Sequence, residues 1–315
     1  MQHPIRHLHH VTATVAEARP DLDFCRRLLG LRLVKRTVNF DNHGVYHFYY
    51  GTERGAPGTL WTTFPYAGWS VSQGVHGAGQ VVATAFSVPS GALDRWRARA
   101  AAAGVPSPEE GERFGAPTLV LRDPSGLVLE LVADGRDARA SWPDGGVNAD
   151  TAIRGLHGVT LLLRERARTL ELMTGLLGFA IVGEMAGRTR LAVGADAPGH
   201  LVDLVESGAA PPARNGLGTV HHVAFAIGSA EEQHRLREEL LRLGHKVTPV
   251  RDRTYFQSIY FREPGGVLFE VATVAPGFTV DEPLDALGAG LKLPPWEEPS
   301  RAEIEAMLPT LGDAG

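Results

Sequence analysis

Two histidine pairs and one glutamate are the residues of this sequence whose types and spacing favour metal chemistry. The pairs are His9-His10 and His221-His222, and the glutamate is Glu270. Each pair opens a stretch of alternating character, typical of a β-strand whose successive side chains lie on opposite faces. We expect His10 and His222 to be the members that face a concave side. Two imidazoles and one carboxylate form the facial ligand set of non-haem Fe(II), and Mn(II) accepts the same set.

Internal repeats place both inward-facing histidines at matching positions. Four similar strand-like segments align His10, Ala83, Gly158 and His222 at one common position. A lone histidine on a strand is usually a structural residue. Two pairs at repeat-matched positions make the metal site the favoured interpretation.

A second repeated signature supplies the glutamate. The stretches 122–126 and 262–266 both read as Pro- and Gly-containing hairpin turns, and each leads into a strand that carries Glu130 or Glu270. Glu130 lies 47 residues after Ala83, and Glu270 lies 48 residues after His222. Only the last unit therefore has both histidine and glutamate, and we expect Glu130 to be structural or solvated.

Helical patterns follow each of the four strand segments, and further strands come after them. The patterns cover residues 21–30, 91–104, 166–178 and 230–244, and each ends in glycine, a frequent residue just past a helix. The sequence thus predicts an α+β protein of four βαβββ units. We expect two domains, 1–145 and 150–280, joined by a turn-rich link at 141–146, and a tail over 281–315 with a helix near Arg301–Leu308. The first and fourth units must meet in one barrel, or two subunits must share the site.

Composition excludes several classes of protein. The chain has 315 residues, 31 Lys and Arg against 36 Asp and Glu, and one cysteine. The mild acidity gives no sign of a nucleic-acid surface, and a single cysteine cannot form an internal disulfide framework or a thiolate cage. No apolar run approaches the roughly 18 residues of a membrane span, and the first residues lack a secretion signal. We therefore expect a cytoplasmic protein.

Other polar residues have both a functional and a structural interpretation. Arg251, Arg253 and Tyr255 precede Glu270 in the chain, where an arginine could hold a phenolate and a tyrosine could donate a hydrogen bond. A solvated loop arginine is the commoner case. His157 aligns with His9, so we expect an outer-shell or structural role for it, and Cys25 lies on an apolar helix stripe and should be core.

Several motifs together resemble a known family. They are His9-His10-Val11-Thr12, the stretch 28–41, Tyr46-His47-Phe48-Tyr49-Tyr50-Gly51, the stretch 260–270, and Leu293-Pro294-Pro295-Trp296. The chain resembles, over nearly its whole length, the ring-cleaving dioxygenases of the hydroquinone 1,2-dioxygenase type. These belong to the vicinal oxygen chelate superfamily, which also holds glyoxalase I and the bleomycin-resistance proteins.

The resemblance implies paired βαβββ modules that form two open barrels, a non-haem Fe(II), and insertion of both atoms of O2 into a small aromatic substrate. It implies that the metal ligands are His10, His222 and Glu270. It also suggests a substrate shell, with Arg251 as the alternative arginine: His9, Thr12, His221, Arg253 and Tyr255. A homo-oligomer is compatible with all of this.

Two other functions stay open at the level of sequence. A glyoxalase-like isomerase or lyase typically needs a fourth protein ligand, and no second glutamate aligns with a histidine-bearing unit. A non-catalytic protein that binds a planar toxic compound would not depend on the metal. The sequence does not specify the ring substituents or hydroquinone over catechol.

Overall fold

The computed structural model describes residues 4–106 and 108–311, which form two curled eight-stranded sheets with few helices. The first sheet has the strand order β14-β15-β16-β13-β1-β4-β3-β2. Its strands are β1 (Ile5–Val15), β2 (Arg32–Asn39), β3 (Asn42–Gly51), β4 (Leu60–Pro65), β13 (Thr219–Ile227), β14 (Arg251–Asp252), β15 (Gln257–Arg262) and β16 (Leu268–Thr273). This sheet combines the first predicted unit with the fourth.

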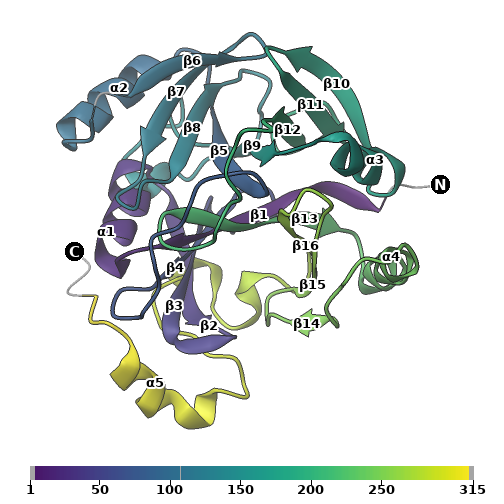
Figure 1. Ribbon diagram of the computed structural model, residues 1–315. Coiled ribbons are helices and arrows are strands. Elements are labelled where there is room, and N and C mark those ends of the chain that lie inside the picture. The colour runs from purple at the N-terminus through teal and green to yellow at the C-terminus, as the bar shows by residue number, and fades with distance from the viewer. Residues whose placement is uncertain (1–3, 107, 312–315) are drawn as a thin grey trace.

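The second sheet, uppermost in Figure 1, has the order β10-β11-β12-β9-β5-β8-β7-β6. Its strands are β5 (Gln80–Val88), β6 (Glu109–Arg113), β7 (Ala116–Arg122), β8 (Val128–Ala133), β9 (Gly155–Leu163), β10 (Phe179–Met185), β11 (Arg188–Val193) and β12 (Leu201–Glu206). It combines the second unit with the third. The structure confirms the predicted α+β class and the two open barrels.

Helices cover the outer faces of the sheets where the sequence predicts them. They are α1 (Ala18–Asp23), which continues as a π-helical turn η1 (Phe24–Leu28), then α2 (Leu93–Ala102), α3 (Ala167–Gly175), α4 (Ala230–Arg242) and, in the tail, α5 (Arg301–Met307). Short 3₁₀ turns are η2 (Pro143–Gly145), η3 (Phe278–Val280), η4 (Leu284–Ala286) and η5 (Glu298–Ser300). The glycines that end the four predicted helical patterns all have positive φ, a conformation that costs glycine little: Gly30, Gly104, Gly178 and Gly244.

Strand pairing at the centre of the first sheet brings the candidate ligands together within one chain. Antiparallel β1 and β13 place His10 opposite Ala224 and Thr12 opposite His222. Parallel β13 and β16 then place Ala224 beside Glu270. The site thus needs no second subunit to bring these three residues together.

Each sheet takes strands from both halves of the sequence, so the division into domains 1–145 and 150–280 stays a prediction. The outermost residues of the first domain and of the tail, 1–3 and 312–315, lie outside the described residues.

Alternation along each strand separates the core from the concave side. On β1, Val11 and Ala13 are buried in the apolar core, and on β13 Phe225 packs against Phe269 with ring centroids 5.0 Å apart. The polar residues between them face into the barrel. Burial of these apolar side chains is the main force that holds the sheets to their helices.

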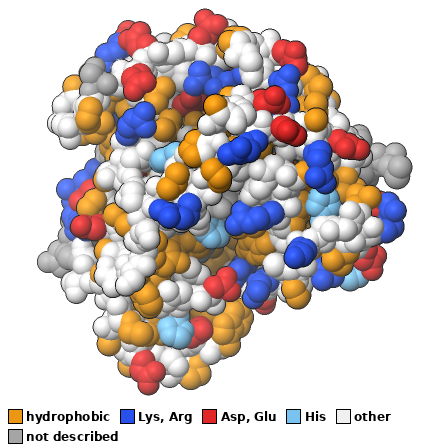
Figure 2. Space-filling model, viewed as in Figure 1, with side chains coloured by type: hydrophobic (Ala, Val, Ile, Leu, Met, Phe, Trp, Pro, Cys, Tyr) orange, Lys and Arg blue, Asp and Glu red, His pale blue; other side chains and the backbone are white. Residues whose placement is uncertain are grey.

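Two long loops cross the face viewed in Figure 1, between β4 and β5 and between β12 and β13. Isolated bridges join them, such as Val75 to Arg214. Figure 2 shows Lys and Arg side chains gathered across the middle of the same face. No helix among the described residues is long and apolar enough to cross a membrane.

Candidate metal centre

His10, His222 and Glu270 converge at one buried point of the first barrel. The Nε2 atom of His222 lies 2.8 Å from Glu270 Oε2, and the Nε2 atom of His10 lies 3.3 Å from the same oxygen. The two Nε2 atoms are 3.2 Å apart. One ligand atom from each residue thus lies within 4.8 Å of the others, and all three side chains are buried.

The donor set fits a divalent metal ion. Glu270 Oε2 is buried and has no hydrogen-bond partner of good geometry among the described residues, although two imidazole nitrogens approach it. A buried polar atom without a partner is costly, and an ion at the centre would satisfy it together with both Nε2 atoms. Nitrogen and oxygen donors in this proportion suit Fe(II) or Mn(II).

Glu270 is held as an anion. Burial acts to raise its pKa, but the facing imidazoles of His10 and His222 outweigh burial and hold the pKa well below its usual range. Its other oxygen, Oε1, accepts a hydrogen bond from Ser258 on the neighbouring strand β15. The carboxylate is therefore oriented by one oxygen and free to bind a metal ion through the other.

Each ligand histidine contacts the histidine that precedes it in the chain. His9 Nδ1 lies 2.8 Å from His10 Nδ1, and His221 Nδ1 lies 2.8 Å from His222 Nδ1. Burial lowers the pKa of His9 well below its usual value and that of His221 to about 3, so both rings are neutral. A neutral neighbour can accept the Nδ1 proton of the ligand, which leaves the ligand's Nε2 deprotonated toward the centre.

A cavity of about 400 Å³ opens beside the three residues. Its walls combine aromatic and polar side chains, a composition suited to a small aromatic molecule with polar substituents. Besides the three candidate ligands, its lining includes Asn39, Asp41, His47, Tyr49, Phe64, His221, Arg251, Arg253, Phe256 and Tyr260.

Arg253 and Tyr260 form a hydrogen-bonded pair on one wall of the cavity. The Arg253 Nε donates to the Tyr260 hydroxyl at 3.1 Å, and its Nη2 donates to Asp41 at 2.9 Å. Burial alone would lower the pKa of Arg253, but Tyr260 and Asp41 raise it above its usual value. The guanidinium is thus a fixed positive charge that faces the cavity. Arg251 also borders the cavity, 3.7 Å from Asp41.

His47 forms a second polar group in the cavity wall. Its Nε2 lies 3.0 Å from the Thr62 hydroxyl oxygen, which lies 2.7 Å from the hydroxyl oxygen of Thr12. Burial, followed by the imidazoles of His10 and His222, lowers the pKa of His47 well below its usual value. Thr12 is fully buried and meets the cavity only through this chain of hydrogen bonds.

The remaining predicted residues separate into two groups. Arg253 and His221 border the cavity, whereas His9 lies behind the metal ligands. Tyr255 is not among the cavity residues, because its hydroxyl donates to Asp281 of the tail at 2.9 Å. Its neighbour Phe256 faces the cavity instead. Cys25 is buried in the core.

Sequence reasoning missed His47, Tyr260 and Phe256. Tyr260 lies directly opposite Glu270 in the pairing of β15 with β16, and His47 lies on the same face of β3 as Tyr49. One signal in the sequence could have found Tyr260. The hairpin at 262–266 joins its strand to that of Glu270, and counting alternate residues back across the hairpin places Tyr260 beside Glu270.

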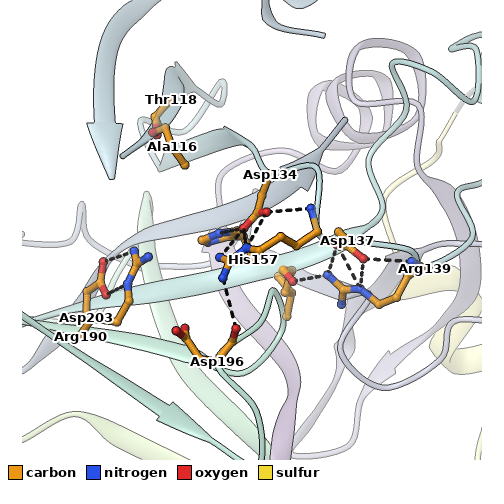
Figure 3. Close-up of polar contacts among 11 residues, drawn as sticks. Ala116, Thr118, Asp134, Asp137, Arg139, His157, Arg190, Asp196 and Asp203 are labelled. Atoms are coloured by element: carbon orange, nitrogen blue, oxygen red, sulfur yellow. Dashed lines mark hydrogen bonds and ion pairs between the residues drawn. The ribbon is translucent and has the colours of Figure 1, made fainter. Parts of the chain in front are cut away.

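The second barrel has the same arrangement of strands without the ligands. Ala85 on β5 lies opposite Gly158 on β9 and beside Glu130 on β8, as Ala224 lies between His10 and Glu270. Figure 3 shows polar contacts in the interior of this second barrel, with Arg190 against Asp203. The Nε atom of Arg190 lies 2.8 Å from Oδ1 of Asp203. The cavity that these two residues line together with Glu130 and Gly158 has a volume of only about 10 Å³.

His157 is part of a separate polar group in Figure 3. Its Nε2 lies 3.4 Å from Asp134, which also binds Arg136. The imidazole is buried and occupies the position that His9 has in the first barrel, behind the place of a ligand.

Comparison with known proteins shows the family to which the chain belongs. A family profile described as "Glyoxalase/Bleomycin resistance protein/Dioxygenase superfamily" matches residues 155–271. A Bacillus subtilis protein named "Putative ring-cleaving dioxygenase MhqO" is 43% identical over 303 residues, 96% of this chain and 95% of the relative. The chain belongs to this superfamily.

Two further similarities sharpen the comparison. A "Chlorohydroquinone/hydroquinone 1,2-dioxygenase" of Sphingobium indicum is 35% identical over 314 residues, 97% of this chain and 96% of that protein. A crystal structure named as a putative dioxygenase from Bacillus subtilis superposes with a TM-score of 0.93 at 41% identity and covers 98% of both chains. The similarity to glyoxalase I of Zea mays, with a TM-score of 0.62 at 14% identity, concerns the fold alone.

Proposed function

We propose that this superfamily member is a non-haem Fe(II)-dependent, extradiol-type dioxygenase that cleaves the ring of a hydroquinone or catechol-type aromatic with O2. The observation that carries the proposal is the buried cluster of His10, His222 and Glu270, which opens onto an aromatic-lined cavity of about 400 Å³. The names of the relatives, which describe dioxygenases, support the same reaction class.

The three protein ligands would hold the iron and leave open positions for two reactants. An iron ion there supplies Lewis acidity and electron transfer between the aromatic ring and O2. In the overall reaction a carbon–carbon bond beside a hydroxyl-bearing carbon breaks, and both oxygen atoms enter the product, so no external reductant is needed.

The cavity residues bind and orient the ring. Phe256, Tyr49 and Phe64 pack around it and exclude water. Arg253 stabilises the negative charge of an ionised ring hydroxyl, and Tyr260 donates a hydrogen bond to the same oxygen in place of Tyr255, which faces the tail. These contacts orient the substrate before the reaction.

His47 is a neutral histidine that borders the cavity. The Nδ1 of His47, whose Nε2 contacts Thr62, can accept a proton from the substrate hydroxyl. His9 and His221 hold the metal ligands through their Nδ1 contacts. Thr12 acts indirectly, because its hydroxyl holds Thr62, and Thr62 in turn orients His47. The cytoplasmic location, the homo-oligomer and the use of Mn(II) in place of iron stay predictions.

Oxygen uptake tests the proposal. The protein is purified without oxygen, loaded with Fe(II), and mixed with a panel of hydroquinones and catechols. We expect one O2 consumed per ring opened, with a new product chromophore, and loss of both in His222→Ala. Iron binding without O2 uptake on any member of the panel would contradict the proposal and favour an isomerase or a binding protein.

A further inference from the structure

A second, larger cavity lies away from the metal cluster. Its volume is about 700 Å³, and it shares no lining residue with the cavity beside Glu270. Its walls come from segments far apart in the sequence: α1 with η1, the start of β2, the link at 142–146, and residues 287–289 of the tail. A π-helical turn such as η1 often marks a functional site.

Positive charge dominates this cavity. Its lining contains two carboxylates, Asp23 and Asp144, against six guanidinium groups: Arg19, Arg26, Arg27, Arg32, Arg36 and Arg99. Asp23 pairs with Arg19 at 2.9 Å and with Arg27 at 3.1 Å. Among residues 4–106 and 108–311, the other four arginines form no ion pair with a carboxylate.

Backbone carbonyls satisfy some of these groups without neutralising them. Arg32 donates to the carbonyls of Glu53 and Leu284, and Arg36 donates to that of Ala289 at 2.9 Å. Arg99 donates to the carbonyls of Leu28 and Gly146 in the same way. The four positive charges therefore remain without a counter-charge.

Two of the arginines that line the cavity have donors without a partner among the described residues. The Nε of Arg36 is buried and has no partner among the described residues. Arg26 is exposed and makes no hydrogen bond or ion pair with the described part of the chain. A guanidinium is a planar fork of donors that binds phosphate and carboxylate groups through paired hydrogen bonds.

Apolar side chains complete the walls. Leu22, Leu31, Leu33 and Leu287 line the cavity, and Trp142 lies with its ring 4.7 Å below the guanidinium carbon of Arg32. A fully inorganic anion would leave this apolar surface in contact with water. The combination fits a ligand with both charged and apolar parts.

We propose that this cavity binds an organic anion with at least two negative charges, carried by phosphate or carboxylate groups. Arg26 and Arg36 hold the charged group, and the leucines with Trp142 contact the apolar part. This site is separate from the proposed dioxygenase site and does not depend on its activity.

Calorimetric titration of the iron-loaded protein tests the site, with phenyl phosphate and isophthalate as probes. Binding is measured against sodium chloride of equal ionic strength. We expect one saturable site per chain, with affinity at least tenfold lower in Arg26→Gln/Arg36→Gln. Arg26→Gln alone weakens binding without affecting folding, because that side chain makes no polar contact with the described residues that could be lost. The two probes tell phosphate recognition from carboxylate recognition.

Two control variants localise the binding. Arg235→Gln on α4 removes an exposed arginine outside the cavity and should leave the affinity unchanged. Glu270→Gln should also leave it unchanged, which excludes binding of the probe at the metal cluster. No saturable binding of either probe, or equal affinity in the double variant, would overturn the proposal.

Discussion

The two barrels of this protein have the same strand arrangement, but one interior is open and the other is closed. In one barrel His10, His222 and Glu270 converge beside a cavity of about 400 Å³. In the other, Gly158 and Ala83 take the two histidine positions, Glu130 takes the position of Glu270, and about 10 Å³ of space remains. One glutamate has a place for a metal ion, and the other has none.

An arginine explains how Glu130 remains buried. Arg113 ends β6 at the position that Arg253 has after β14, as the pairing of Gly111 with Thr118 and of Arg251 with Ser258 shows. Arg113 forms an ion pair with Glu130, whereas Arg253 binds Asp41 and Tyr260 and leaves Glu270 to the histidines. A buried carboxylate needs a positive partner, and each barrel supplies a different one.

Paired charges also close the rest of the second barrel. Arg190 binds Asp203 through two hydrogen bonds of 2.8 and 3.0 Å, where the first barrel has Tyr49 opposite Thr62. At these matched positions the first barrel therefore has the uncharged Tyr49 and Thr62, which form no ion pair across the interior and leave room for the cavity. Substitutions at matched positions of the two barrels test this difference between them.

Neutralising the two matched glutamates should reduce activity in one case and leave it unchanged in the other. Glu270→Gln removes the anionic ligand, so we expect ring cleavage to fall by at least ~10³-fold, about 4 kcal/mol in activation free energy. Glu130→Gln should leave turnover of the folded protein within about twofold. Steady-state O2 uptake measures both, and equal losses in the two variants would remove the distinction between the barrels.

Breaking the paired charges should affect stability only. Asp203→Asn leaves the buried guanidinium of Arg190 without its anion, so the free energy of unfolding should fall by about 3 kcal/mol. Thr62→Val, at the equivalent position of the first barrel, should cost about 1 kcal/mol. Urea unfolding compares the two variants. A larger loss in the threonine variant would show that the ion pair does not hold the second barrel closed.

Replacing the two equivalent arginines with lysine should weaken substrate binding at one position and lower stability at the other. Arg253→Lys keeps the charge but loses the fork that contacts both Tyr260 and Asp41, so we expect KM to rise roughly tenfold with kcat little changed. Arg113→Lys should leave KM unchanged and lower stability by about 1 kcal/mol. A rise of KM in both variants would contradict the different roles assigned to these arginines.

Two aspartates, one near each barrel, should contribute to stability with opposite dependence on pH. The imidazole of His157, followed by Arg136, holds the pKa of Asp134 below its usual value despite burial. Its contribution to stability is therefore present above pH ~4 and lost as the pH falls. Burial raises the pKa of Asp21 to about 6 against hydrogen bonds from Thr63 and Tyr50. Its contribution is present in acid and lost as the pH rises toward and past 6.

Urea unfolding across pH 8 to 3 tests both signs. Asp134→Asn should reduce the loss of stability below pH ~4, and Asp21→Asn should remove a gain of about 1 kcal/mol between pH 8 and pH 5. Parallel pH profiles in the two variants would show that these aspartates do not differ in environment as the structure indicates.

Sequence reasoning predicted the repeated architecture because it depends on local patterns. Strand alternation and the glycines after each helix placed the four units, and the repeat alignment selected His10, His222 and Glu270, which the structure brings together. The contents of the cavity depend on contacts across the fold. Tyr255 illustrates this, because its hydroxyl donates to Asp281 of the tail, which also pairs with Lys35, and the side chain does not reach the cavity.

The iron content of matched variants tests whether the metal centre lies in the first barrel. The wild-type protein, Glu270→Gln and Glu130→Gln are loaded anaerobically with Fe(II), freed of excess metal, and analysed for iron per chain. We expect one iron per chain in the wild type and in Glu130→Gln, and iron close to zero in Glu270→Gln. Full iron content in Glu270→Gln, or loss of iron in Glu130→Gln, would contradict the assignment of the metal centre to the first barrel.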